Sequence, residues 1–143
     1  MADAEQEIEE LLNFLLPVAE EELSRAGEFY PYAAMVAVDG ELKSVTARTG
    51  DEPEVGDLLV ALHEELRVQA ADGSIRASGI AADVTLTDPD SGETTDAVQL
   101  ELDHADGDPV DIYVPYETEG REVKFGELVS AAGREPIFTD ATS

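Results

Sequence analysis

The sequence contains no cysteine and no tryptophan, and only two of its eight basic residues are lysines, Lys43 and Lys124. Without cysteine there can be no disulfide, no thiolate nucleophile and no zinc–thiolate site. With so few bases the chain lacks the clustered positive charge that binding to nucleic acid or anionic membranes requires. No apolar run approaches the ~20 residues of a membrane span, and no basic stretch precedes an apolar segment at the N-terminus. We therefore expect a cytoplasmic protein with no nucleic-acid partner and no membrane partner.

Acidic residues dominate what is present. Thirty-four Asp and Glu oppose eight Lys and Arg, which gives a formal net charge of −26 on 143 residues. Such a surface repels itself in dilute buffer, and salt screens the repulsion. The acid-rich, lysine-poor, cysteine-free composition resembles that of proteins from salt-accumulating microbes. The alternatives are an ordinary acidic protein, or one whose partner is a basic protein.

Alternating apolar and polar residues between Ser78 and Val114 predict three antiparallel strands joined by short loops. One apolar face per strand, with acids opposite, is typical of a half-buried meander. On this pattern we expect Leu100 and Val84 to lie in the core on the same, helix-facing side of the sheet. The apolar positions are Ile80, Ala82, Val84 and Leu86 in the first strand, Val98, Leu100 and Leu102 in the second, and Val110, Ile112 and Val114 in the third.

Upstream, the spacing of leucines predicts a helix from Ala2 to Ala26, kinked or split into two at Pro17. Residues 33–38 and 42–48 predict a hairpin around Asp39-Gly40, with a bulge that shifts its register. Asp57 is a suitable N-cap for a second helix that ends at Ala71.

Beyond Val114 the pattern weakens. Pro115 is expected to end the strand, and residues 116–120 to form a loop. Val123 and Phe125 could add a short strand, residues 127–132 one helical turn, and residues 137–138 a small apolar anchor before a polar tail from about residue 139. We interpret residues 1–143 as a single domain.

These elements predict an α+β fold with two main helices in the order α-β-β-α-β-β-β. The antiparallel sheet would have five strands, or six if Val123 and Phe125 form one. In element order alone the chain resembles profilin-like and roadblock-type domains, in which helices pack on a five-stranded antiparallel sheet. Likeness at this level implies nothing about function.

The residues that could carry catalysis form no recognisable motif. His63-Glu64-Glu65 begins like a helical zinc-protease motif, but Arg67 stands where the second histidine would be. His63 is expected on the exposed side of its helix, and His104 has no visible partner for general-base chemistry. The acids of the two meander turns are explained by turn chemistry as well as by calcium binding. We predict no catalytic residue, no metal site and no cofactor, and lean against an enzyme.

The four tyrosines fall in two segments, Tyr30 with Tyr32 and Tyr113 with Tyr116. Tyrosine combines apolar area with a polar tip and is common at binding surfaces, although it also packs the ends of sheets. Leu12 and Leu16 widen the apolar band of the first helix. We interpret the chain as an interaction module that forms a homodimer. The alternatives are a small-ligand binder or enzyme with a pocket near the tyrosines, and an acidic decoy or immunity-type protein for a basic partner.

Overall fold

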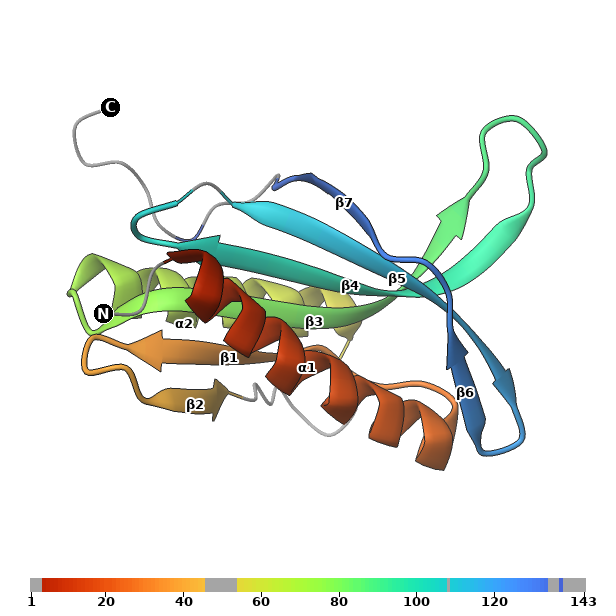
Figure 1. Cartoon of the computed structure of the whole chain (residues 1–143), viewed down its shortest axis with the longest axis horizontal. Helices are drawn as coiled ribbons and strands as arrows, with labels where there is room; N and C mark the ends of the chain where they lie inside the picture. The colour runs from red at the N-terminus through yellow and green to blue at the C-terminus, as the bar shows by residue number, and fades with distance from the viewer. Residues whose placement is uncertain (1–3, 46–53, 108, 134–136, 138–143) are drawn as a thin grey trace.

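The computed structural model describes residues 4–45, 54–107, 109–133 and 137, which form an α+β fold with two helices and one antiparallel sheet (Figure 1). Seven strands pair in the order β2-β1-β3-β4-β5-β6, and β7 pairs with β5. Among these residues, no helix is long and apolar enough to cross a membrane. The elements are α1 (Ala4–Ala26), β1 (Tyr32–Ala37), β2 (Leu42–Val45), α2 (Val55–Ala71), β3 (Ile75–Thr87), β4 (Thr94–His104), β5 (Val110–Glu119), β6 (Glu122–Phe125) and β7 (Val129–Ala132).

Helix α1 lies across one face of the sheet and packs through a stripe at four-residue spacing (Figure 1). Leu11, Leu15, Ala19 and Leu23 are at most 1% exposed, which places one side chain per turn against the strands. The expectation of two short helices is wrong, because α1 runs unbroken through Pro17. Pro17 is exposed, so water can solvate the carbonyl that its missing N–H leaves free.

Helix α1 packs tightly on the sheet at Gly79 in β3. A Cβ atom there would lie 2.6 Å from Leu15 Cδ1 and 2.9 Å from Leu102 Cδ2, so no larger residue fits without movement. Ala77 and Ala81, the neighbours of Gly79 on the same side of β3, are also fully buried. The small residues of β3 thus form the surface against which α1 packs.

Helix α2 covers the opposite face (Figure 1), where Leu62 and Leu66 pack against Ile80 and Ile137. The expectation that Leu100 and Val84 share one face is therefore wrong. Leu100 pairs with Ala81 and faces α1, whereas Val84 pairs with Ala97 on the α2 side. The alternation in β3 was correct, but both faces of the strand are covered, so its alanines are core residues too.

The second helix begins three residues before the predicted start. Glu54 is its N-cap, without a side-chain hydrogen bond, and Asp57 lies in the first turn. The acidic charge of Asp57 still suits the positive end of the helix dipole.

The β1–β2 hairpin has the shifted register that the sequence suggested. Val36 pairs with Leu42 rather than with Lys43, and Gly40 adopts a φ of 93° in the turn, a conformation that glycine accepts without strain. Residues 46–48 of the predicted strand lie outside the described residues.

The C-terminal part contains two corrections. Strand β5 continues through Pro115 to Glu119, although Pro115 was expected to end it. Pro115 lies where β5 passes from pairing with β7 (residues 110–113) to pairing with β6 (residues 116–119), so its missing N–H breaks no ladder bond. Residues 129–132, expected as a helical turn, form strand β7 because β5 offers a free edge. Strand β6 is the short strand that Val123 and Phe125 could add.

Candidate functional site

The four tyrosines do not form one cluster. Tyr32 and Tyr116 are buried in the core beneath α1, and Tyr30 is 60% exposed. Tyr113 lies on the other face of β5, where its hydroxyl accepts a 3.3 Å hydrogen bond from Gln99 Nε2. The Tyr32 hydroxyl donates to the carbonyl of Leu15 in α1, and burial raises the pKa of Tyr32. Of the four, Tyr30 offers the largest free surface.

Tyr116 connects the core to a partly buried carboxylate on β3. Its hydroxyl donates a 2.6 Å hydrogen bond to Asp83 Oδ1. Burial raises the pKa of Asp83; hydrogen bonds from Tyr116 and the backbone of Phe29 oppose this rise, and the charges of Asp96 and Glu28 add to it. Burial and Asp83 together raise the pKa of Tyr116. Asp83 is therefore held in place but lacks a cationic partner among these groups.

Asp83 lines a cavity of about 490 Å³ beneath the exit of α1. One wall is apolar and aromatic, and the ring of Phe29 is fixed by an edge-to-face contact with Tyr32 at a centroid distance of 5.7 Å. Arg25 is paired with Glu22. The lining residues are Glu22, Arg25, Ala26, Glu28, Phe29, Tyr30, Val55 and Asp83.

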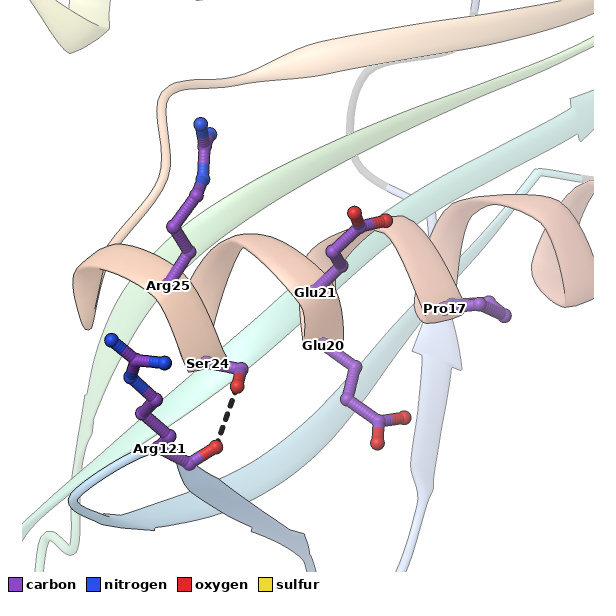
Figure 2. Close-up of a pocket in the computed structure, with 6 residues that line it drawn as sticks. All are labelled: Pro17, Glu20, Glu21, Ser24, Arg25 and Arg121. Atoms are coloured by element: carbon purple, nitrogen blue, oxygen red, sulfur yellow. Dashed lines mark hydrogen bonds between the residues drawn. The ribbon is translucent and has the colours of Figure 1, made fainter.

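A second cavity of about 530 Å³ lies between α1 and the β5–β6 hairpin (Figure 2). Arg25 and Arg121 lie toward the C-terminal end of α1, Glu20 and Glu21 lie in the middle, and Pro17 lies at the other end. The hydroxyl of Ser24 donates a 2.6 Å hydrogen bond to the carbonyl of Arg121 and fastens the hairpin to the helix. Charges of both signs line this cavity, so they define no class of ligand.

Leu12 and Leu16 are half-buried and pack against the core under α1. The wide apolar band that they add to the helix is therefore largely in contact with the rest of the molecule. Figure 1 shows the β5–β6 hairpin beside the C-terminal half of α1.

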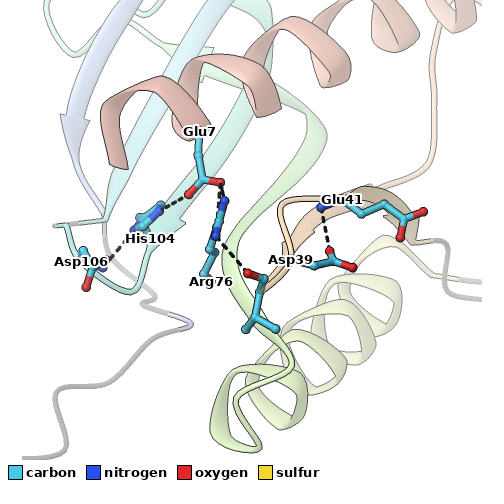
Figure 3. A network of polar contacts seen from close by, with 7 residues as sticks. Glu7, Asp39, Glu41, Arg76, His104 and Asp106 are labelled. Carbon is cyan, nitrogen blue, oxygen red and sulfur yellow. Dashed lines mark hydrogen bonds and ion pairs between the residues drawn. The ribbon is translucent and has the colours of Figure 1, made fainter. Parts of the chain in front are cut away.

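A buried polar network joins the start of α1 to β3 and β4 (Figure 3). Glu7 is 2% exposed and accepts hydrogen bonds from Arg76 Nε at 2.8 Å and from His104 Nε2 at 2.8 Å. Arg76 also donates to the carbonyl of Val38 at 3.0 Å. Burial would raise the pKa of Glu7, but the hydrogen bonds and charges of Arg76 and His104 hold it below its ordinary value.

Both ring nitrogens of His104 are hydrogen-bonded. The backbone N–H of Asp106 donates to His104 Nδ1 at 2.9 Å, and Nε2 donates to Glu7. Glu7 could have been found in the sequence, because it lies four residues before Leu11 on the buried stripe.

His63 is 6% exposed, so the expectation that it lies on the outer side of α2 is wrong. Its Nδ1 donates to the carbonyl of Leu59 at 2.7 Å, and its Nε2 lies 2.8 Å from Glu101 Oε2 on β4. Because a carbonyl only accepts, His63 Nδ1 carries a proton and is the donor in the first contact. Both histidines are thus buried and bonded at both ring nitrogens, which leaves neither nitrogen free to act as a general base.

Asp88 and Ser91 accept hydrogen bonds from the backbone of the first meander turn. Asp88 accepts the backbone N–H of Asp90 at 2.8 Å, and Ser91 Oγ accepts that of Glu93 at 3.2 Å. Within the described part of the chain, no group of three or more His, Asp or Glu side chains is arranged to hold a metal ion.

Within the described residues, β7 is an edge strand that pairs only with β5. All four residues of β7 are exposed, with Val129 at 56% and the preceding Leu128 at 46%. The run from Leu128 to Gly133 contains no charge. By contrast, the edge strand β2 carries Lys43, and β6 carries Glu122 and Lys124.

No family model matches the chain, and neither the curated proteins nor the solved structures include a significant match. The resemblance to profilin-like and roadblock-type domains thus stays one of element order. Any functional argument must come from the surfaces described above.

Proposed function

We propose that this protein is a non-enzymatic interaction module that forms a two-fold symmetric homodimer by pairing the β7 edge strands of two copies. The observation that carries the proposal is an exposed, charge-free edge strand on a chain of net charge −26. Free strand edges invite pairing with another chain, and proteins usually protect them with charges. The other edges of this sheet have that protection, and β7 does not.

The hydrogen-bonding groups of β7 suit this pairing. The N–H of Gly133 donates to the carbonyl of Pro109 at 3.0 Å, so the backbone N–H and C=O of Gly133 point toward β5. The backbone groups of successive residues in a strand point to opposite edges. Those of Ala131 and Val129 therefore also point toward β5, and those of Ser130 and Ala132 point outward. An antiparallel copy with its two-fold axis at Ala131 would pair Ser130 of each chain with Ala132 of the other.

The distribution of charge favours the β7 edge over other surfaces as the dimer contact. Two copies repel each other through their acids, and the repulsion is smallest where the contact itself holds no charge and salt screens the rest. Leu128 beside the strand and Val129 within it would add apolar area. A closed two-fold pair is also the commonest homo-oligomer. A cytoplasmic location accords with the composition and belongs to the same proposal.

Light scattering tests the proposal. In ~1 M KCl, where the Debye length is about 3 Å, the wild-type mass should be about twice the 15.3 kDa of the chain. Ser130→Pro removes one outward N–H, and Val129→Lys places a charge on the edge; both should give monomers that remain folded by circular dichroism.

The matched control is Ser44→Pro on the opposite edge. The carbonyl of Glu41 accepts from Ala37 in β1, so by the same alternation Ser44 points outward from β2. This variant should remain a dimer. A wild-type monomer in high salt, or loss of the dimer in Ser44→Pro but not in Ser130→Pro, would refute the β7 assignment.

A further inference from the structure

The cavity beneath the exit of α1 combines an aromatic wall with carboxylates. Its volume of about 490 Å³ lies within the range of small-molecule sites. Phe29 is fixed by Tyr32, and Tyr30 beside it is 60% exposed. A large aromatic ring kept in water next to a fixed one provides a face on which a ligand can stack.

The charged residues that line the cavity favour a positively charged ligand. Three carboxylates line it against one guanidinium, and Arg25 is already paired with Glu22. One of the carboxylates, Asp83, accepts a 2.6 Å hydrogen bond from the Tyr116 hydroxyl. The neighbouring charges of Glu28 and Asp96 disfavour its ionised form, and a bound cation would relieve that repulsion.

We propose that this cavity binds a small organic cation, an ammonium group on an apolar body, with the charge between Asp83 and the ring of Tyr30 and the body against Phe29 and Val55. A cation over an aromatic ring is attracted to the ring face, and the carboxylate supplies the ionic contact. A bare metal ion would suit the site less well, because the wall formed by Phe29 and Val55 offers apolar carbon rather than oxygen ligands.

The test is a titration with phenethylammonium chloride, followed by backbone amide NMR in ~1 M KCl, which suppresses diffuse attraction to the acidic surface. We expect shifts confined to residues 26–30, 55 and 83. The neutral isostere 2-phenylethanol should bind at least about fivefold more weakly, because it lacks the charge that Asp83 and Tyr30 attract. Equal binding of the alcohol, shifts spread over the whole surface, or no shift at millimolar ammonium would overturn the proposal.

Variants locate the charge. Tyr30→Ala and Asp83→Asn should each weaken binding about two- to fivefold, the range for one exposed cation–π contact or one partly exposed ion pair. Tyr30→Phe keeps the ring and should bind as the wild type does. Asp90→Asn, in the exposed β3–β4 turn, is the control for net charge. If Asp90→Asn weakens binding as much as Asp83→Asn, the attraction is diffuse and the site assignment is wrong.

Thermal melts and light scattering distinguish a loss of ligand binding from a loss of folding or of dimerisation. The side-chain amide of the Asp83→Asn variant keeps an oxygen that can accept the Tyr116 hydroxyl, and thermal melts will show whether the variant stays folded. If the Asp83→Asn variant unfolds, Glu28→Gln takes its place, because it removes another lining carboxylate from an exposed position. Neither residue lies on β7, so light scattering of Tyr30→Ala should give the wild-type mass whether or not the ammonium binds.

Discussion

Glu7 is the buried carboxylate that joins the first turn of α1 to two strands, and Glu7→Gln tests how much this contact stabilises the fold. Removing one partner of a buried ion pair typically costs about 3–5 kcal/mol. Arg76 is 34% exposed, so water screens part of the loss, and glutamine keeps one acceptor oxygen. We therefore expect Glu7→Gln to lower the free energy of unfolding by about 2–4 kcal/mol.

For a chain near this length, each kcal/mol shifts the melting temperature by about 2–4 °C, so the expected fall is about 5–15 °C in a calorimetric melt at neutral pH. The control is Glu9→Gln, an exposed acid of the same helix, which should change stability by less than ~0.5 kcal/mol. Equal melting temperatures for the two variants would show that the network contributes nothing.

The same pair of proteins gives a pH dependence. The pKa of Glu7 in the folded protein is below its ordinary value of 4.5. Its contribution is therefore fully present above about pH 4.5 and is lost as the pH falls through the lower, folded pKa. The difference in stability between wild type and Glu7→Gln should be constant from about pH 7 to about pH 5 and should shrink in stronger acid. A difference that grows on acidification would contradict this assignment.

The remaining predictions concern packing and charge. Leu100→Ala should destabilise the protein by about 2–5 kcal/mol, and the half-buried Val84→Ala by less than ~1.5 kcal/mol, measured by urea unfolding; equal losses would contradict the opposite faces assigned to the two residues. Gly79→Ala should cost about 1–3 kcal/mol through overpacking against α1, whereas Gly56→Ala in the open first turn of α2 should stabilise by up to ~1 kcal/mol. The melting temperature should rise between ~0.05 M and ~1 M KCl; an unchanged or lower melting temperature would contradict the interpretation that the protein is adapted to salt.

Local sequence patterns were sufficient to predict an element where the residue spacing is compatible with only one kind of secondary structure. The leucines of α1, the Asp39-Gly40 turn and the alternation around Leu100 each predicted an element that the structure contains. They failed where a partner distant in the chain decides the outcome. Residues 129–132 have small side chains that suit a helix as well as a strand, and only the free edge of β5 makes them a strand. Pro115 is tolerated because β5 changes partners there.

The candidate sites show the same limit. Tyr30 was among the expected surface residues, and it does line a cavity, but its neighbour Asp83 is one of 34 acids and carries no local signal. Tyr113 and Tyr116 are three residues apart and therefore point to opposite faces of β5. His63 contacts Glu101, 38 positions away, and local sequence carries no signal for that contact.

By itself, the sequence determined the α+β class, the order of its helices and first five strands, and the charge that governs its behaviour in salt. Periodicity and composition are local or summed properties, so they can be evaluated without knowing which residues meet. The tertiary structure alone decided that the two helices cover opposite faces, that Glu7 and His104 meet, and that the uncharged β7 is an edge strand among the described residues. Each of these depends on contacts between distant segments, because the pairing of strands and the packing of helices determine which side chains are buried together.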